Sequence, residues 1–283
     1  MLLAVPNVSE GRDPDVLAAI GDAFAAAGAR VLDLHADPDH HRAVFTLAGE
    51  PGALHVAVAD GARVATERID LTRHAGLHPH VGAVDVAPIV FRAPEQRGAA
   101  VAEALALADA LGQLGLPVFL YGALGDGRTR AELRRGGSEA LGRRMADGLR
   151  PDFGPPALHP TAGATLVAAR PPLVAFNLEL APPATEEDAR RIAAALRETG
   201  AHGLPGLRAI GLSLAARAGV AQVSCNVEDH GALPLAALLE AVERHAVVAE
   251  AELVGLAPQA ALEGWPERVP IRNRATLEER LSC

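Results

Sequence analysis

The sequence predicts an α/β (α+β) fold made of two subdomains, residues 1–169 and 170–283. Three observations support this prediction. Apolar runs typical of strands alternate with segments of helical spacing along all 283 residues. The pattern begins again near residue 163. In the second half the predicted order is β-α-β-β-α-β, which is the order of a split βαβ sandwich.

The first half starts with the same order of elements and then adds a helix and a strand. Asp13 and Pro14 are typical of a helix start, and helical spacing continues to Gly28. The polar stretch 35–42 is expected to be a turn, and the Arg-rich stretch 128–148 a broken surface helix. The expected strands are 2–5, 30–34, 43–48, 84–90 and 117–121, and the further expected helices are 52–69 and 94–114.

The second half contains a clear helix-start signal. Thr185 is followed three residues later by Asp188, which is a capping-box pattern, so a helix is expected from there to Gly200. Strand-like sequence in 164–180 is interrupted by two prolines at 171 and 172. The other expected elements are strands over 208–214, 220–227 and 251–256 and a helix over 233–245.

The composition excludes several function classes. Lys+Arg minus Asp+Glu is 26 − 35 = −9, and aromatic residues make up only 3%, which argues against a nucleic-acid partner. The sequence contains no lysine, which excludes lysine Schiff bases and phosphate-loop lysines. Cys225 and Cys283 are too few for a disulfide scaffold or a cysteine zinc site. No leader pattern or membrane-length apolar stretch is present, so we expect a soluble cytoplasmic protein without a membrane partner.

Seven of the eleven histidines lie between His35 and His80. The sharpest segment is 73–85, in which His78 is followed by Pro79 and flanked by Gly76 and Gly82. Proline fixes the backbone and glycine permits tight turns, so His78 is predicted to be a rigidly presented imidazole suited to acid–base chemistry. A surface loop whose histidines bond to the backbone is an equally good interpretation of the spacing alone.

Two further segments allow more than one interpretation. Asp37, Asp39, His40 and His41 are of the right types for a divalent metal, and a polar turn held by Asp37 and Asp39 is the alternative. The stretch 151–163 holds four prolines and two glycines, which excludes a helix or a central strand. It is therefore either a linker or one wall of a ligand cleft.

Taken together and in order, these segments resemble the glutamate formiminotransferase family, which also forms the N-terminal part of formiminotransferase-cyclodeaminase. The matching pieces are 5–11, 37–46, His74-x-Gly-x-His78-Pro79, 82–88, 117–122, 151–155, 163–165, 175–177 and 221–226. They cover most of the chain. The resemblance implies two ferredoxin-like βαββαβ subdomains with a ligand cleft between them, commonly as a homodimer.

The resemblance also implies an activity. The family moves a formimino group between N-formimino-L-glutamate and tetrahydrofolate in histidine degradation, with tetrahydrofolate as co-substrate and no metal. His78 would be the acid–base residue. Binding of folate or substrate is implied for Asn7, Arg42, His74 and Asp85, and for the loop residues Gly154, Pro155, Pro156, Ala157, Leu158, His159, Pro160, Thr161, Ala162 and Gly163.

The chain departs from the family's usual pattern beside these residues. Ala75, Leu77 and His80 stand where members usually have Lys, Glu and Arg, and His41 stands where an Asn is common. Two alternatives to the transferase are therefore kept. One is a non-catalytic paralogue that binds a folate-like ligand, and the other is a metal-dependent hydrolase that uses Asp37, Asp39, His40 and His41.

Overall fold

A computed structural model of the chain describes residues 1–75 and 80–282. The chain divides into two compact units, Met1–Pro171 and Pro172–Cys283. The predicted subdomain boundary at 169/170 lies two residues before this division, inside strand β7. No helix within the described ranges is both long enough and apolar enough to span a membrane.

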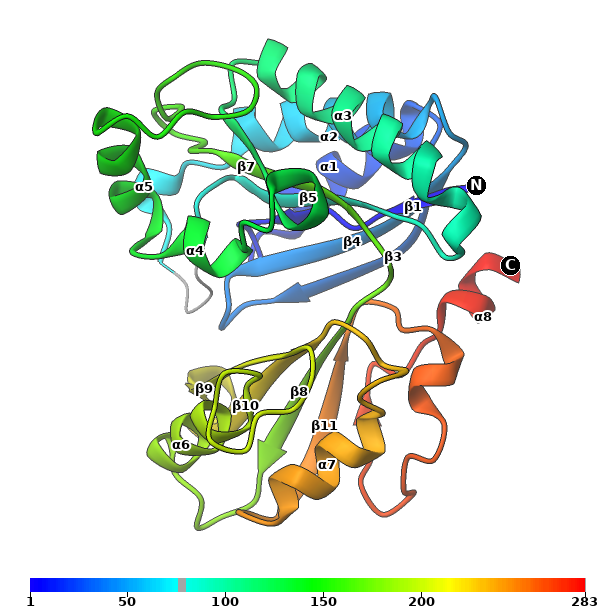
Figure 1. Cartoon of the computed structure of the whole chain (residues 1–283), viewed down its shortest axis with the longest axis vertical. Coiled ribbons are helices and arrows are strands. Elements are labelled where there is room, and N and C mark those ends of the chain that lie inside the picture. Colours follow the sequence, from blue (N-terminus) through cyan, green and yellow to red (C-terminus); the bar gives the residue numbers. More distant parts are fainter. Residues whose placement is uncertain (76–79, 283) are drawn as a thin grey trace. The chain divides into compact units, whose positions relative to one another are not determined.

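The first unit is a seven-stranded sheet with helices on it (Figure 1). Its strands are β1 (Leu2–Ala4), β2 (Asn7–Val8), β3 (Arg30–Asp37), β4 (Arg42–Gly49), β5 (Val84–Val90), β6 (Val118–Leu120) and β7 (Thr165–Arg170). Its helices are α1 (Pro14–Ala26), α2 (Leu54–Arg68), α3 (Arg97–Gln113), α4 (Arg130–Arg134) and α5 (Gly137–Ala146), with 3-10 turns η1 (Leu71–Arg73), η2 (Pro94–Gln96) and η3 (Gly122–Gly125).

The strand order of this sheet explains its fold class. Both β1 and β2 pair with β4 and with β5, so together they form one interrupted strand between those two. Strand β3 pairs with β4 at the edge, and β7 and β6 extend the sheet in parallel beyond β5. The central part is therefore the βαββαβ sandwich that the sequence predicts, with an added helix and strands at one side.

Local sequence signals start and orient α1. The Asp13 carboxylate accepts hydrogen bonds from the N–H groups of Asp15 and Val16, at 3.0 and 3.1 Å, and Pro14 occupies the first turn. The buried face carries Leu17, Ile20 and Phe24, one to two turns apart. This face packs against α2 and the sheet.

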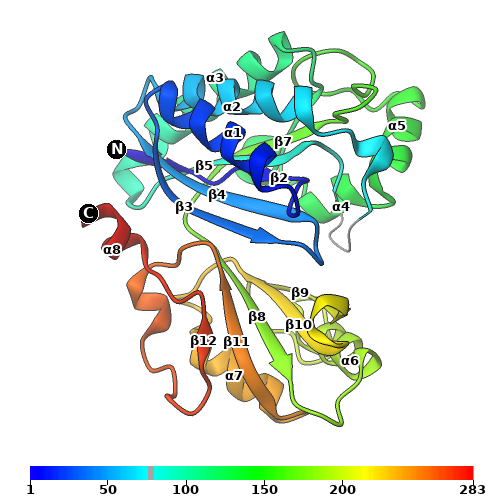
Figure 2. The ribbon, with the colours of Figure 1, turned by 180° about the vertical axis from the view of Figure 1, so that it is seen from behind.

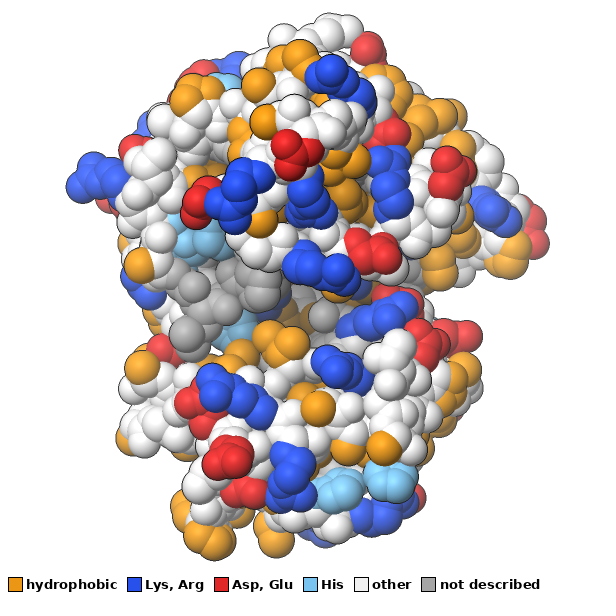
Figure 3. All heavy atoms as spheres, turned by 60° about the vertical axis from the view of Figure 1, so that its left-hand side comes forward, with side chains coloured by type: hydrophobic (Ala, Val, Ile, Leu, Met, Phe, Trp, Pro, Cys, Tyr) orange, Lys and Arg blue, Asp and Glu red, His pale blue; other side chains and the backbone are white. Residues whose placement is uncertain are grey.

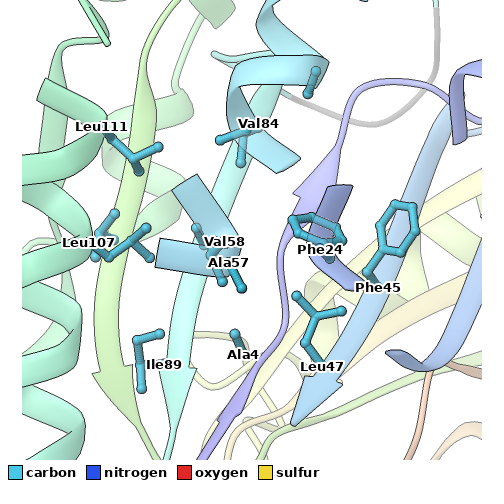
Figure 4. Packing of buried hydrophobic residues seen from close by; sticks show 14 of the residues in the cluster. Ala4, Phe24, Phe45, Leu47, Ala57, Val58, Val84, Ile89, Leu107 and Leu111 are labelled. Atoms are coloured by element: carbon cyan, nitrogen blue, oxygen red, sulfur yellow. The ribbon is translucent and has the colours of Figure 1, made fainter. Parts of the chain in front are cut away.

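Because aromatic residues are scarce, the core of the first unit consists mainly of Ala, Leu and Val, with one aromatic pair. The rings of Phe24 on α1 and Phe45 on β4 meet edge-on, with 5.2 Å between centroids (Figure 4). Helix α3 presents Leu107 and Leu111 to the strands beside buried alanines. On the opposite face of the sheet, Leu133 of α4 and Leu141 and Met145 of α5 form a smaller cluster with Phe119.

The second unit is a five-stranded sheet in the order β12-β11-β8-β10-β9 (Figure 2). The strands are β8 (Val174–Leu180), β9 (Leu207–Leu214), β10 (Val220–Val227), β11 (Val248–Val254) and β12 (Ile271–Arg272). The helices are α6 (Glu186–Leu196), α7 (Leu235–Glu243) and α8 (Leu277–Ser282), with η4 (Ala215–Arg217) and η5 (Gln259–Leu262). Strands β8 to β11 with α6 and α7 give the predicted βαββαβ order.

Alternation along β8 separates two kinds of surface. Phe176, Leu178 and Leu180 belong to the apolar cluster that α6 and α7 cover, while Asn177 and Glu179 face the other way. There the Arg272 Nη2 lies 2.8 Å from Glu179 Oε1, and the Asn177 amide donates to Glu252 at 3.0 Å. The Arg272 contact helps attach the two-residue strand β12 to the sheet, while the Asn177–Glu252 bond joins β8 to β11.

Most predicted elements are confirmed, but several of their boundaries were wrong. His35, Ala36 and Asp37 continue β3, because they pair with Val44, Ala43 and Arg42 in the hairpin; their polarity made them resemble a turn. Helix α6 begins at the predicted capping box but ends at Leu196 instead of Gly200. Strand β11 starts at Val248, three residues before the predicted start.

Gly61 provides a test of the packing between α1 and α2. A Cβ atom added there would lie 2.0 Å from Cε1 of Phe24. Gly61→Ala should therefore lower the free energy of unfolding by about 1–3 kcal/mol, measured by urea denaturation, although alanine favours helices. The loss should shrink in a Phe24→Leu background.

Gly98 on α3 is the matched control, because a Cβ there meets no atom within 4 Å. Gly98→Ala should stabilise the protein by up to about 1 kcal/mol. Equal effects of the two substitutions would contradict the packing argument.

Candidate functional site

The predicted site segment 73–85 is anchored in the first unit at both of its described ends. Its N-terminal end follows η1, where the His74 N–H donates to the Leu71 carbonyl. Its C-terminal end runs from His80 into β5. His78, together with Gly76, Leu77 and Pro79, lies outside the described residues. The acid–base role of His78 therefore stays a prediction.

Three imidazoles from different parts of the first unit form a stack, which we call the histidine stack (His41, His74 and His80). The His41 and His74 rings lie nearly parallel, 4.3 Å apart with an interplanar angle of 22°. The His80 ring meets His74 edge-on at 4.2 Å. His74 Nε2 is also 2.9 Å from the His41 carbonyl oxygen, to which it donates. The stack thus joins the β3–β4 turn to the two residues that flank 75–79.

The turn before α1 holds the His41 side of the stack. Glu10 Oε1 accepts hydrogen bonds from the N–H groups of Gly11, Arg12 and Asp13 at 2.8, 2.6 and 3.0 Å. The same oxygen lies 3.4 Å from His41 Nδ1, which also accepts the Gly11 N–H at 3.2 Å. A Cβ on Gly11 would lie 2.3 Å from the Asp37 carbonyl, so only glycine fits there. His41 itself has φ of +49°, a conformation that is rare for side chains other than Gly, Asn, Asp and His.

Burial keeps His41 and His74 uncharged near neutral pH. Desolvation lowers the pKa of His41 below its ordinary value of 6.5; Glu10 opposes this shift, while Arg12 and His80 add to it. Desolvation likewise lowers the pKa of His74, against the hydrogen bond to the His41 carbonyl, and the neighbouring imidazoles lower it further. Both rings are therefore predominantly neutral at pH 7.

Asp85 anchors the C-terminal end of the segment. Its Oδ1 accepts the Val81 N–H at 2.8 Å, and its Oδ2 forms an ion pair with Arg134 of α4. Ser9 Oγ donates to the carbonyl of Gly82 at 2.7 Å. Because both oxygens of Asp85 are occupied and the residue is 2% exposed, its observed role is to fix the chain at Val81. Binding of a ligand by Asp85 stays a prediction.

The predicted loop 154–163 lies directly against this segment. The Ala83 N–H donates to the Ala162 carbonyl and the Leu71 N–H to the Thr161 carbonyl, both at 2.8 Å. A Cβ on Gly163, which has φ of +68°, would lie 2.1 Å from the Val81 carbonyl. His159 Nδ1 accepts the Ala162 N–H at 3.0 Å and so closes the end of the loop. The structure therefore brings together η1, residues 81–83 and the end of the Gly/Pro-rich loop.

The remaining parts of the predicted loop differ in exposure. Gly154 has φ of +78° and approaches the Leu116 carbonyl, while Leu158 packs on the α5 cluster. The residues that are exposed to solvent are Gly154, Pro156, Ala157 and Pro160. Pro155 is half-buried. The exposed residues offer backbone and ring surface to a ligand.

Asn7 and Arg42 lie in the central strands near the stack. Asn7 pairs with Val44 and Val86 in mid-sheet, and its amide donates to the Val5 carbonyl at 3.0 Å. Arg42 begins β4 directly after His41 and pairs with Asp37. Figure 3 shows arginine and acidic side chains interspersed over the displayed face, with histidine side chains exposed among them. Ligand binding by Asn7, Arg42 and His74 stays a prediction.

The four candidate metal ligands, Asp37, Asp39, His40 and His41, lie at the turn between β3 and β4. Asp37 Oδ1 accepts the N–H groups of Asp39 and His40, both at 2.9 Å, which is the turn-holding alternative that the sequence allows. Among the described residues, no three of Asp37, Asp39, His40 and His41 place ligand atoms close enough to share an ion.

Two contributors were missed by the sequence analysis. Glu10 lies in the matching piece 5–11, but nothing in the sequence indicates its contact with His41, 31 positions away. Arg134 lies in the Arg-rich stretch, where nothing singles it out from its neighbours. Both residues act through long-range contacts, which spacing along the chain does not reveal.

Comparison with known families agrees with the fold and the arrangement of these segments. Residues 1–170 match the family model described as the formiminotransferase domain, N-terminal subdomain, and residues 175–265 match the formiminotransferase domain model. The fold and the matches define a formiminotransferase-domain protein with two subdomains. The chain belongs to the formiminotransferase family, which confirms the resemblance predicted from its motifs.

Two kinds of curated proteins are similar to the chain. The glutamate formimidoyltransferase of Streptococcus pyogenes serotype M1 is 35% identical over 272 residues, which cover 91% of this chain and 89% of that protein. The formimidoyltransferase-cyclodeaminases of Sus scrofa and Mus musculus are 38% and 37% identical, over 91% of this chain and 50% of those proteins. The chain spans about half the length of these two-part relatives.

His55 lies outside the stack and has a different partner. Glu103 of α3 accepts hydrogen bonds from the His55 ring at 2.9 Å and from the N–H groups of His55 and Gly52, both at 2.6 Å. The carboxylate therefore satisfies N–H groups at the start of α2. Burial alone would raise the pKa of Glu103, but these hydrogen bonds lower it below 4.5.

This pair gives a pH-dependent prediction of stability. Glu103→Gln should lower the free energy of unfolding at pH 7 by about 1–3 kcal/mol, because buried N–H groups lose a charged acceptor. A depressed carboxyl pKa contributes stability at pH above 4.5 that is lost as pH falls through the folded-state pKa. The difference between wild type and variant, measured by urea unfolding, should therefore shrink between pH 5 and pH 3. A constant difference would contradict this assignment.

Proposed function

We propose that the chain transfers a formimino group between N-formimino-L-glutamate and tetrahydrofolate. The observation that carries this proposal is the 35% identity to a stand-alone glutamate formimidoyltransferase over 89% of that relative's length. A second such enzyme, from Thermoplasma acidophilum, is 32% identical over 88% of its length. Both match this chain across both units.

In the proposed reaction, N5 of tetrahydrofolate attacks the formimino carbon of the donor. His78 accepts the N5 proton as the new C–N bond forms, and a tetrahedral intermediate results. The bond from that carbon to the glutamate nitrogen then breaks, and the imidazolium returns the proton to the departing nitrogen. The products are 5-formiminotetrahydrofolate and glutamate, so atoms and charges balance.

The described residues support this proposal in three ways. The Gly/Pro-rich loop offers backbone and ring surface directly beside the segment that carries His78 in the sequence. Arg42 is suited to bind a carboxylate of folate or of the donor, because a guanidinium can bond both carboxylate oxygens. Asp85 and the histidine stack hold the described ends of segment 73–85, as acid–base geometry requires. The ligand cleft between the subdomains, the homodimer and the cytoplasmic location stay predictions.

An assay of the purified protein tests the reaction and the role of His78. Formiminoglutamate should be consumed only when tetrahydrofolate is present. His78→Ala should reduce kcat at least about 100-fold, because a positioned acid–base group contributes roughly 10²–10⁴. The dissociation constant for folate, measured by calorimetry, should change by no more than a few-fold.

His202→Ala is the matched control, since His202 is an exposed histidine of the second unit. It should retain wild-type turnover. Full activity of His78→Ala would remove His78 from the mechanism. Folate binding without turnover of any imino or formyl donor by the wild type would instead favour the non-catalytic paralogue.

A further inference from the structure

The histidine stack is assembled in a way that suits neutral rings. Gly11 N–H donates to His41 Nδ1, so that nitrogen carries a lone pair and the ring proton lies on Nε2. His74 Nε2 donates to the His41 carbonyl, so Nδ1 of His74 carries the lone pair. The hydrogen bonds therefore assign the same neutral tautomer to both stacked rings.

A further proton disturbs this arrangement. On His74 it would occupy Nδ1, which is buried and has no hydrogen-bond partner among the described residues. On His41 it would occupy Nδ1 and end the 3.2 Å bond from the Gly11 N–H, which would keep its 2.8 Å bond to Glu10 Oε1; that oxygen, 3.4 Å from Nδ1, is the acceptor for the new proton. Among the described residues, the charged or titratable groups that act on His41 and His74 from outside this pair are Glu10, Arg12 and His80, and of these only Glu10 favours a proton. Protonation thus opposes the stacked geometry.

Two residues of the histidine stack flank His78 in the sequence. His74 comes four residues before His78, and His80 comes two residues after it. The ring contact at 4.2 Å ties these flanking residues together, and His41 ties both to the β3–β4 turn. His41 has φ of +49°, a left-handed conformation that histidine and asparagine adopt more readily than most residues.

We propose that His41 and His74 are positioning residues for the transfer: their stack, complete only while both rings are neutral, holds the flanks of the segment that carries His78. This inference rests on the proposed function. Neither ring is required to touch the substrate. Acidification then removes activity in two ways, by protonating His78 and by opening the stack.

The pH profile of kcat/KM tests this inference. In the wild type, the acid limb of log(kcat/KM) should have a slope approaching two. In His41→Asn it should have a slope of one, because asparagine tolerates positive φ but cannot take up the proton. On the acid limb the wild type should therefore lose about tenfold more activity per pH unit than the variant. At pH 7.5 the variant should show about tenfold lower kcat with KM within about twofold.

His202→Asn is the control and should keep the wild-type slope, since this exposed histidine lies in the second unit. If His41→Asn does not fold, as judged by circular dichroism, His74→Gln replaces it, with the same expected loss of steepness, because glutamine cannot take up the proton either. Equal slopes in the wild type and a folded stack variant would overturn the positioning role and leave the transfer reaction intact.

Titration of the imidazole resonances by NMR separates this inference from the proposed function. The His74 ring should titrate below pH 6.5 in the wild type and at higher pH in His41→Asn, because burial and a neighbouring ring are lost. This measurement needs no turnover. Absence of formimino transfer in the wild type would contradict the proposed function. An unchanged pKa of His74 in His41→Asn would instead contradict the positioning role of the histidine stack.

Discussion

The close backbone approach between residues 81–83 and 162–164 is the constraint on which the candidate site depends. A Cβ on Gly82 would lie 1.9 Å from the Ala164 carbonyl, and one on Gly163 would lie 2.1 Å from the Val81 carbonyl. Two glycines thus allow the end of the Gly/Pro-rich loop to bond directly to the strand that follows the histidines. Because these bonds join backbones, the arrangement is independent of the side chains that a ligand would contact.

The core of the first unit determines where the histidine stack lies. Helix α1 packs through Phe24 against Phe45 of β4, and this contact fixes the direction of the helix. The turn that leads into α1 carries Glu10 and Gly11, which hold the His41 ring. The hairpin β3–β4 and the start of α1 are therefore positioned by the same packed interface. Packing in the core of the first unit therefore sets the distance between Glu10 and His41.

Local signals made much of the fold predictable from the sequence. The Asp13 cap and the Thr185 capping box start α1 and α6 at the predicted residues. The strand extension through His35–Asp37 was not predictable in this way, because it depends on pairing with residues 42–44 and not on apolar alternation. For the site, motif order identified the two segments that meet, whereas Glu10 and Arg134 act through contacts that only the folded chain creates. Long-range partners of charged residues leave no periodic signal in one sequence.

The absence of lysine shapes the electrostatics around the segment that carries the histidines. Arginine stays protonated at any working pH, so the ion pair between Arg134 and Asp85 persists while the imidazoles titrate. Arg12 is likewise a permanent cation, and it helps keep His41 uncharged. The segment is thus held at its C-terminal end by this ion pair and at its N-terminal end by the His74 ring, which stacks on His41. That asymmetry places the proposed response to pH at the His41 and His74 end of the segment, because a proton changes the contacts of these two rings.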